Sequence, residues 1–284
     1  MSNPPSESPY FRQQLMQSKR AVIAVVVVAL WLGGLSMMLR RNANRSEAQT
    51  LAEVALRIQP ATFYYVVEKN GEQIGAASSA LDTTSKSLVS EEYFVGSYPS
   101  PKGLERTSAR WETKLTRGFR LTDFRINIAR PTEPFSIKAS LSDDTTLVIV
   151  GGTATPGHPV TRSVRPSMLT PALAPIGLML AASPEIGRRQ RVSVFEPTTR
   201  KVIEAELTIS AESLFTLVDS AAPDRNGTWV AAHRDTVRAW RLAGAPSGVT
   251  AWVDAEGRIV SAKVGEFSVL RTAFEIAFKN SSKQ

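Results

Sequence analysis

The sequence of 284 residues has no cysteine, which excludes disulfides, thiolate metal sites and cysteine nucleophiles. It has only two histidines, and neither accompanies a Gly-x-Ser-x-Gly or Ser-x-x-Lys pattern of the serine hydrolases. His158 stands in a Pro-Gly-His-Pro turn, and His233 stands close to Asp235. We interpret both histidines as surface residues and predict no catalytic residue and no enzymatic activity.

Cofactor and metal motifs are also missing. Neither Gly-x-x-x-x-Gly-Lys nor Gly-x-Gly-x-x-Gly occurs, so the common nucleotide-binding loops are absent from the sequence. Acidic pairs fall only in turn-like or strand-like segments, where solvated carboxylates are ordinary. These pairs are Glu91-Glu92, Asp143-Asp144 and Asp254 with Glu256. We predict no cofactor and no metal site, with a weak Ca²⁺ contact at one of these pairs as the alternative.

The net charge of +8 is unevenly distributed along the chain. Residues 1–45 carry six basic residues and one acidic residue, which leaves 28 basic and 25 acidic residues in the remaining chain. A nucleic-acid-binding face requires clustered basic residues, usually with aromatic residues among them, and the later residues mix both signs instead. We therefore predict no nucleic-acid partner and assign the excess of positive charge to the flanks of a membrane segment.

Ala21–Leu39 is an uncharged apolar run of 19 residues. At about 1.5 Å per residue, a helix of this length matches the roughly 30 Å hydrocarbon core of a bilayer. Basic pairs bound it, Lys19-Arg20 before and Arg40-Arg41 after, whereas a buried core helix usually keeps a polar face. A cleaved secretory signal is the other alternative, but the run is long for a signal core and no small-x-small cleavage site follows. We predict an uncleaved signal-anchor that contacts the lipid bilayer.

The flanking charges are balanced and do not orient this segment. The tail of residues 1–20 is short and rich in Ser, Pro and Gln, so we expect it to be disordered and to stay in the cytoplasm. Long domains translocate largely regardless of charge. The expected location is the cell inner membrane, single-pass, with a periplasmic C-terminal domain.

Ser46–Ile58 has the capping residue and the one-sided apolar pattern of a short helix, and strand patterns follow from Thr62 onward. Asn70-Gly71 predicts a hairpin, because both central positions of a type I′ turn need positive φ. The parity of apolar residues changes after Leu121, which predicts a β-bulge near Thr122. The expected strands lie in residues 62–75, 87–95, 104–115, 119–128, 135–141, 147–152, 191–195, 201–210, 214–218, 228–232, 237–242 and 249–264.

Many short strands with short connections between them predict a mainly β fold. We expect one N-terminal transmembrane helix followed by a curved antiparallel sheet or open half-barrel with one or two packed helices. The predicted parts are a disordered tail (1–20), the transmembrane helix (21–39), a juxtamembrane linker with the short helix (40–61) and a β-rich extracytoplasmic domain (62–284). Residues 270–279 fit either a strand or a helix.

Ser167–Ser183 is apolar but is interrupted by Pro171 and Pro175, which makes it too short and too broken to span a bilayer. Two interpretations remain open. The segment is either a helix that closes one end of the sheet, or a mobile apolar lid over a groove with Met168 and Met179 as adaptable contacts.

Three segments carry a resemblance: Thr62–Gly75 with its Asn-Gly turn, Val192–Thr199, and Ala251–Val260. Together they resemble uncharacterised bacterial envelope β-domains, which are similar to the half-barrel of outer-membrane lipoprotein carriers and to domains found beside transglutaminase-like enzymes. The resemblance implies a fold rather than an activity. It also has limits, because the chain lacks the cysteine of a transglutaminase-like centre and of a lipidated receptor, and a soluble carrier would keep no anchor.

Two functions are compatible with these patterns. The first is a membrane-anchored, non-enzymatic extracytoplasmic domain that binds an apolar or lipid-like ligand in its concave face, beneath residues 167–183. The alternative is a structural or accessory module that docks an envelope enzyme or transporter. The candidate ligand-lining residues are Met168, Met179, Trp111, Trp240, Trp252 and Phe267, and core packing is the alternative role for the aromatic ones.

Overall fold

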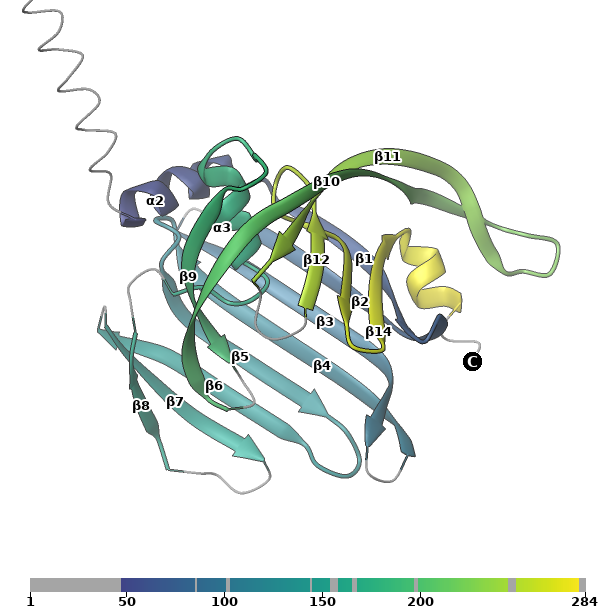
Figure 1. Cartoon of the computed structure of the whole chain (residues 1–284). Coiled ribbons are helices and arrows are strands. Elements are labelled where there is room, and N and C mark those ends of the chain that lie inside the picture. Colours follow the sequence, from purple (N-terminus) through teal and green to yellow (C-terminus); the bar gives the residue numbers. More distant parts are fainter. Residues whose placement is uncertain are drawn as a thin grey trace, which may run out of the picture. The chain divides into compact units, whose positions relative to one another are not determined.

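A computed structural model describes residues 47–84, 86–100, 103–143, 145–153, 158–164, 168–196, 199–244 and 249–280 (Figure 1). The predicted tail of residues 1–20 and the predicted transmembrane helix Ala21–Leu39 lie outside this part of the chain. Among the residues that are described, no helix combines the length and the apolar character needed to cross a membrane.

Fourteen antiparallel strands form one open sheet, in the order β8-β7-β6-β5-β4-β3-β2-β1-β14-β13-β12-β11-β10-β9 (Figure 1). The prediction of a mainly β fold with an open antiparallel sheet and few helices is therefore confirmed. The strands are β1 Ala61–Lys69, β2 Glu72–Thr83, β3 Ser87–Ser100, β4 Gly103–Thr116, β5 Leu121–Ala129, β6 Phe135–Asp143, β7 Thr146–Thr153, β8 Val160–Ser163, β9 Arg189–Glu196, β10 Lys201–Pro223, β11 Trp229–Ala243, β12 Val249–Val253, β13 Ile259–Val264 and β14 Phe267–Thr272.

Two local predictions are confirmed by the backbone. Asn70 and Gly71 have φ of 52° and 84°, the left-handed values that the predicted β1–β2 turn requires. Between β4 and β5, Lys114 pairs with Asp123 and Leu115 pairs with Leu121. Thr122 is therefore the extra residue of a β-bulge, at the position where the apolar parity changes.

The prediction was wrong about the length of β10 and β11, each of which was expected as two strands. In β10, Ile209 pairs with Leu242 and Ala211 pairs with Arg241, so Ser210 is a bulge residue inside one continuous strand. The bulge reverses the alternation of side chains, which resembles a strand end in the sequence.

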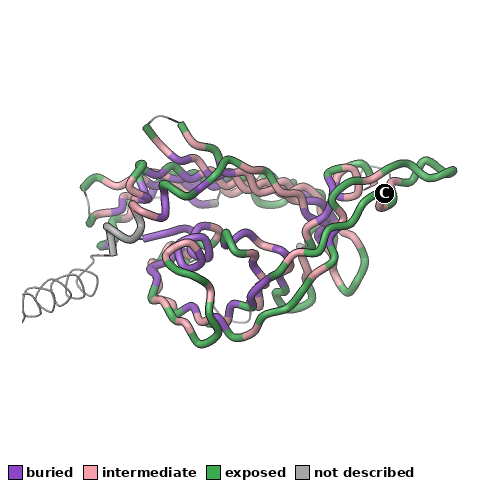
Figure 2. Tube along the Cα trace, turned by 90° about the horizontal axis from the view of Figure 1, so that it is seen from above, coloured by how far each residue is buried: buried purple, intermediate pink, exposed green. Residues whose placement is uncertain are grey.

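The sheet rolls so that strands from its two halves face each other across the core. Phe124 of β5 and Phe195 of β9 are fully buried, and their ring centroids lie 4.7 Å apart. Near the two free edges, Arg162 Nε of β8 donates to Arg200 O, directly before the start of β10, over 3.3 Å. Figure 2 shows the buried residues gathered between the two layers that this roll creates. The two halves of the sheet therefore enclose its inner face, although the edge strands β8 and β9 do not pair with each other.

Two α-helices lie together at one end of the sheet (Figure 1). α2 (Glu47–Arg57) confirms the short helix predicted for residues 46–58. It contacts α3 (Ala174–Ala181), the helical part of the Pro-interrupted segment, where Arg57 Nη1 donates to Leu180 O over 3.2 Å. At the C-terminus, β14 is followed by the π-helix η1 (Glu275–Lys279), so the ambiguous residues 270–279 contain both kinds of structure.

Candidate functional site

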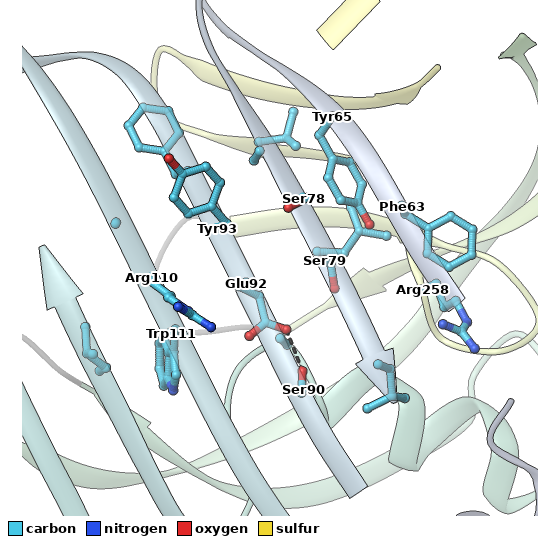
Figure 3. Close-up of a pocket in the computed structure, with 18 of the residues that line it drawn as sticks. Phe63, Tyr65, Ser78, Ser79, Ser90, Glu92, Tyr93, Arg110, Trp111 and Arg258 are labelled. Carbon is cyan, nitrogen blue, oxygen red and sulfur yellow. Dashed lines mark hydrogen bonds between the residues drawn. The ribbon is translucent and has the colours of Figure 1, made fainter. Parts of the chain in front are cut away.

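A cavity of about 440 Å³ lies on the concave face of the sheet (Figure 3). Strands β1 to β5 supply its floor, α3 and the turn between β12 and β13 cover it, and β14 closes one side. Most of its wall is apolar, and five aromatic residues line it: Phe63, Tyr65, Tyr93, Phe94 and Trp111. This volume falls within the range of sites that bind small molecules.

The floor is built from cross-strand neighbours, because side chains at paired positions of an antiparallel sheet project to the same face. Ser79 of β2 pairs with Glu92 of β3, and Glu92 pairs with Trp111 of β4. The row continues to Phe63 of β1 on one side and to Ile126 of β5 on the other. Glu92 therefore stands in the middle of a row that is otherwise apolar or uncharged (Figure 3).

Burial raises the pKa of the Glu92 carboxyl from 4.5 to about 7, because the cavity disfavours its charged form. Hydrogen bonds from the hydroxyls of Ser90 and Ser79 offset part of this rise, and the bond from Ser90 Oγ to Glu92 Oε1 measures 2.7 Å. No basic side chain of the described residues forms an ion pair with Glu92. A carboxyl group without a countercharge in an apolar cavity is typical of a functional site rather than of a structural ion pair.

The neighbouring Glu91 has the opposite environment. It projects to the outer face of the sheet, where its Oε2 accepts from Arg110 Nη2 over 2.8 Å, and both side chains are exposed. The interpretation of the pair as two solvated acids was therefore wrong for Glu92. The alternation of β3 carries the missed signal, since Leu88, Ser90, Glu92 and Phe94 share one parity and Leu88 is fully buried.

Two arginines lie against the ring of Phe63, which lines the cavity. The guanidinium carbons of Arg258 and Arg271 lie 5.0 and 4.8 Å from the ring centroid. Arg258 donates to Glu256 Oε2 over 3.0 Å, and Arg271 donates to Asp254 Oδ2 over 2.7 Å. Both cations therefore have carboxylate partners of their own.

The roof depends on close contact between the β12–β13 turn and the start of α3. Gly257 has φ of +80°, and a Cβ atom placed there would lie 2.5 Å from the Cα of Ile176 and 2.6 Å from the carbonyl oxygen of Pro175. Glycine is thus required both by the backbone conformation and by the space available. The turn that joins β12 to β13 is closed by Gly257 N, which donates to Asp254 O over 2.9 Å.

Of the six predicted ligand-lining residues, Trp111 lies in the wall of the cavity. Met168, Met179 and Trp240 are buried in the main hydrophobic core. Trp252 packs against Phe215 in a separate cluster, with ring centroids 5.2 Å apart, and Phe267 stacks on Tyr98 at 5.6 Å. The cavity contact of α3 comes from Ile176 instead of the methionines.

One further cluster of polar side chains lies on β10 and β11. His233 Nδ1 is 3.6 Å from Asp219 Oδ2 and 3.7 Å from Asp235 Oδ1. Their ligand atoms are close enough to share a cation, but all three side chains are exposed. Structural zinc sites usually have four ligands in a closed shell, so we assign this cluster no metal.

No protein-family model matches the sequence, and no curated protein matches it. Among solved structures, a β-barrel-like protein of the domain of unknown function DUF1849 from Brucella abortus aligns with a TM-score of 0.47 and 13% identity, over 75% of this chain and 94% of that chain. A DUF1089 family protein from Pseudomonas aeruginosa aligns with a TM-score of 0.37 and 7% identity, over 65% of this chain and 87% of that one.

Both structural neighbours are bacterial proteins whose descriptions assign them no function. They show no link to lipoprotein carriers or to transglutaminase-like enzymes. At such low identity the likeness concerns the fold alone and assigns no ligand or activity to this chain.

Proposed function

We propose that this chain is a membrane-anchored, non-enzymatic protein whose extracytoplasmic β-domain binds an apolar or lipid-like ligand. The observation that carries the proposal is the cavity of about 440 Å³ on the concave face, walled mainly by apolar side chains beneath α3. Ligand sites of this kind combine a mostly apolar wall with a few placed polar groups, here Glu92 and its serine neighbours.

Filling the cavity tests this function. Ala109 lines it on β4, whereas Ser108, one residue earlier on the same strand, faces the other side of the sheet. We expect Ala109→Trp to weaken the binding of radiolabelled decanol at least ten-fold, because the indole occupies the ligand's space, while Ser108→Trp leaves it unchanged. Equilibrium dialysis against the full chain in lipid nanodiscs, corrected with empty discs, measures both values. Equal affinity in the two variants would refute binding in this cavity.

The membrane part of the proposal is supported by the uncharged run Ala21–Leu39 and its basic flanks. We expect the full-length chain to stay in the membrane through alkaline washing. Protease added to intact spheroplasts is expected to digest residues beyond Arg45. Protection of the β-domain until lysis would place it in the cytoplasm, and a free soluble domain would indicate a cleaved signal.

The alternative function, docking of an envelope enzyme or transporter, is favoured by one feature of the sheet. Beyond their pairing with β9 and β12, β10 and β11 pair only with each other in the described part of the chain, and they form a projecting two-stranded ribbon (Figure 1). The ribbon exposes Leu214 (66%) and Val230 (44%) to solvent. It is the surface through which an accessory module would contact a partner.

A further inference from the structure

One acidic side chain of the cavity, Glu92, has no basic partner among the described residues. Glu92 is the only acidic residue among the described residues that line the cavity. Its partners are hydroxyl groups, Ser90 Oγ at 2.7 Å and Ser79. Hydroxyls can donate to a carboxylate, but they cannot neutralise its charge. An ionised Glu92 therefore lacks a countercharge in the described part of the chain.

The nearby basic groups are all engaged elsewhere. From the β12–β13 turn, Arg258 donates to Glu256 Oε2 and, over 2.6 Å, to Gln59 O. From β14, Arg271 donates to Asp254 Oδ2. From β4, Arg110 pairs with Glu91 on the outer face of the sheet. None of these side chains neutralises Glu92.

One further titratable group faces this part of the cavity. Burial holds the pKa of the Tyr65 hydroxyl on β1 well above its usual value, so Tyr65 stays neutral and supplies no charge. The next residue along the floor, Trp111 of β4, is the cross-strand partner of Glu92. Its Nε1 is buried without a hydrogen-bond partner among the described residues.

The aromatic rings of the cavity also differ in whether a cation lies over them. The ring of Phe63 already carries the guanidinium groups of Arg258 and Arg271. No cation of the described residues lies over the ring of Trp111, which stands beside Glu92 in Figure 3. A carboxylate next to an indole ring is an arrangement that attracts ammonium groups, through an ion pair and a cation–π contact.

We infer that the polar end of the ligand is a primary ammonium group, bound by the Glu92 carboxylate beside the Trp111 ring, with its alkyl chain along the apolar wall. This inference rests on the proposed function, because it names the chemical class of the ligand in the same cavity. It distinguishes alkylamines from alcohols of equal length, which lack the charge, and from fatty acids, whose carboxylate would face that of Glu92.

The protonation of Glu92 gives the inference a pH signature. Below about pH 7, the pKa to which burial raises this carboxyl, Glu92 holds a proton that must leave before it can pair with an ammonium group. The affinity for an alkylamine should therefore rise about ten-fold or more between pH 5 and pH 8. The affinity for an alcohol should not follow this change.

We test the inference by equilibrium dialysis of the full chain in nanodiscs, which measures its affinity for decylamine, decanol and decanoate. At pH 8 we expect decylamine to bind tightest, and Glu92→Gln to weaken decylamine about 10- to 100-fold, the usual effect of a hydrogen bond between charged groups. The same substitution should change decanol less than three-fold. Glu91→Gln, which removes the adjacent outer carboxylate, should leave all three affinities unchanged.

The outcomes separate the inference from the function on which it rests. If decanol binds and Ala109→Trp abolishes that binding, but Glu92→Gln weakens both ligands equally or neither, the ammonium assignment fails and the apolar site remains. Decanoate that binds as tightly as decylamine would overturn the assignment in the same way. If none of the three ligands binds, both the proposed function and the inference are wrong.

Discussion

Replacing Glu92 by glutamine is expected to stabilise the unliganded protein at pH 8 and to change its stability little at pH 4.5. The folded protein raises the pKa of Glu92 from 4.5 to about 7, so between these values the folded state retains a proton that the unfolded chain releases. Stability is therefore lost as the pH rises through this window. Because one pKa unit corresponds to about 1.4 kcal/mol, Glu92→Gln should gain up to about 3 kcal/mol above pH 7.

Urea unfolding of both proteins at half-unit steps from pH 4.5 to pH 8 measures this difference. Glu91→Gln is the matched control, because it removes an exposed carboxylate that pairs with Arg110 at 2.8 Å. Exposed ion pairs contribute at most about 1 kcal/mol, so the control should be neutral or slightly destabilising at every pH. A stability difference between Glu92→Gln and the natural protein that stays constant across the pH range would contradict a partly buried Glu92 carboxyl without a countercharge.

When a residue serves ligand binding, its replacement is expected to stabilise the protein and to weaken ligand binding. Binding residues are commonly kept in environments that cost stability, and their removal relieves that cost. A purely structural carboxyl would behave in the opposite way, since the loss of its hydrogen bonds would destabilise the fold. The pH series and the ligand series therefore examine the same side chain from two independent directions.

Local sequence patterns were sufficient to predict the turns and most strands, because these depend on adjacent residues. Asn70-Gly71 predicted its turn, and the parity change near Thr122 predicted its bulge. Prediction failed where the pattern was interrupted inside a strand. The bulge at Ser210 divided β10 into two expected strands. The edge strand β8 was not anticipated, because its residues Val160–Ser163 include one apolar side chain and its pairing is with β7 alone.

The candidate site was less accessible to prediction, because it depends on which strands become neighbours. The alternation of β3 places Glu92 on the same face as Leu88, but only the register with β2 and β4 puts it between Ser79 and Trp111. Of the two interpretations of residues 167–183, the structure shows the helix, α3, and one of its residues lines the cavity. The sequence did not predict how this helix is rotated about its axis. The rotation places Ile176 at the cavity and Met179 in the core.

The roof of the cavity provides the last prediction, because it depends on one glycine. Gly257 and Gly71 have nearly the same backbone conformation, with φ of +80° and +84°, and both lie in hairpin turns. They differ in their surroundings. A Cβ at residue 71 would have nothing within 4 Å, whereas a Cβ at residue 257 would meet the backbone of Ile176 and Pro175 at 2.5 to 2.6 Å.

Substitution of each glycine by alanine therefore separates the strain of the backbone from the contact with α3. Gly71→Ala should cost about 1–2 kcal/mol of unfolding free energy, the usual penalty of a left-handed conformation for a residue with a Cβ. Gly257→Ala should cost about 1–3 kcal/mol more, because the backbone of α3 must move to accept the methyl group. That movement displaces Ile176, so decanol binding should weaken in Gly257→Ala and stay unchanged in Gly71→Ala. Urea unfolding and equilibrium dialysis of the full chain measure the two effects. Equal costs for both variants would mean that the β12–β13 turn does not hold α3 in place, and the roof would then depend on the contact between α2 and α3 instead.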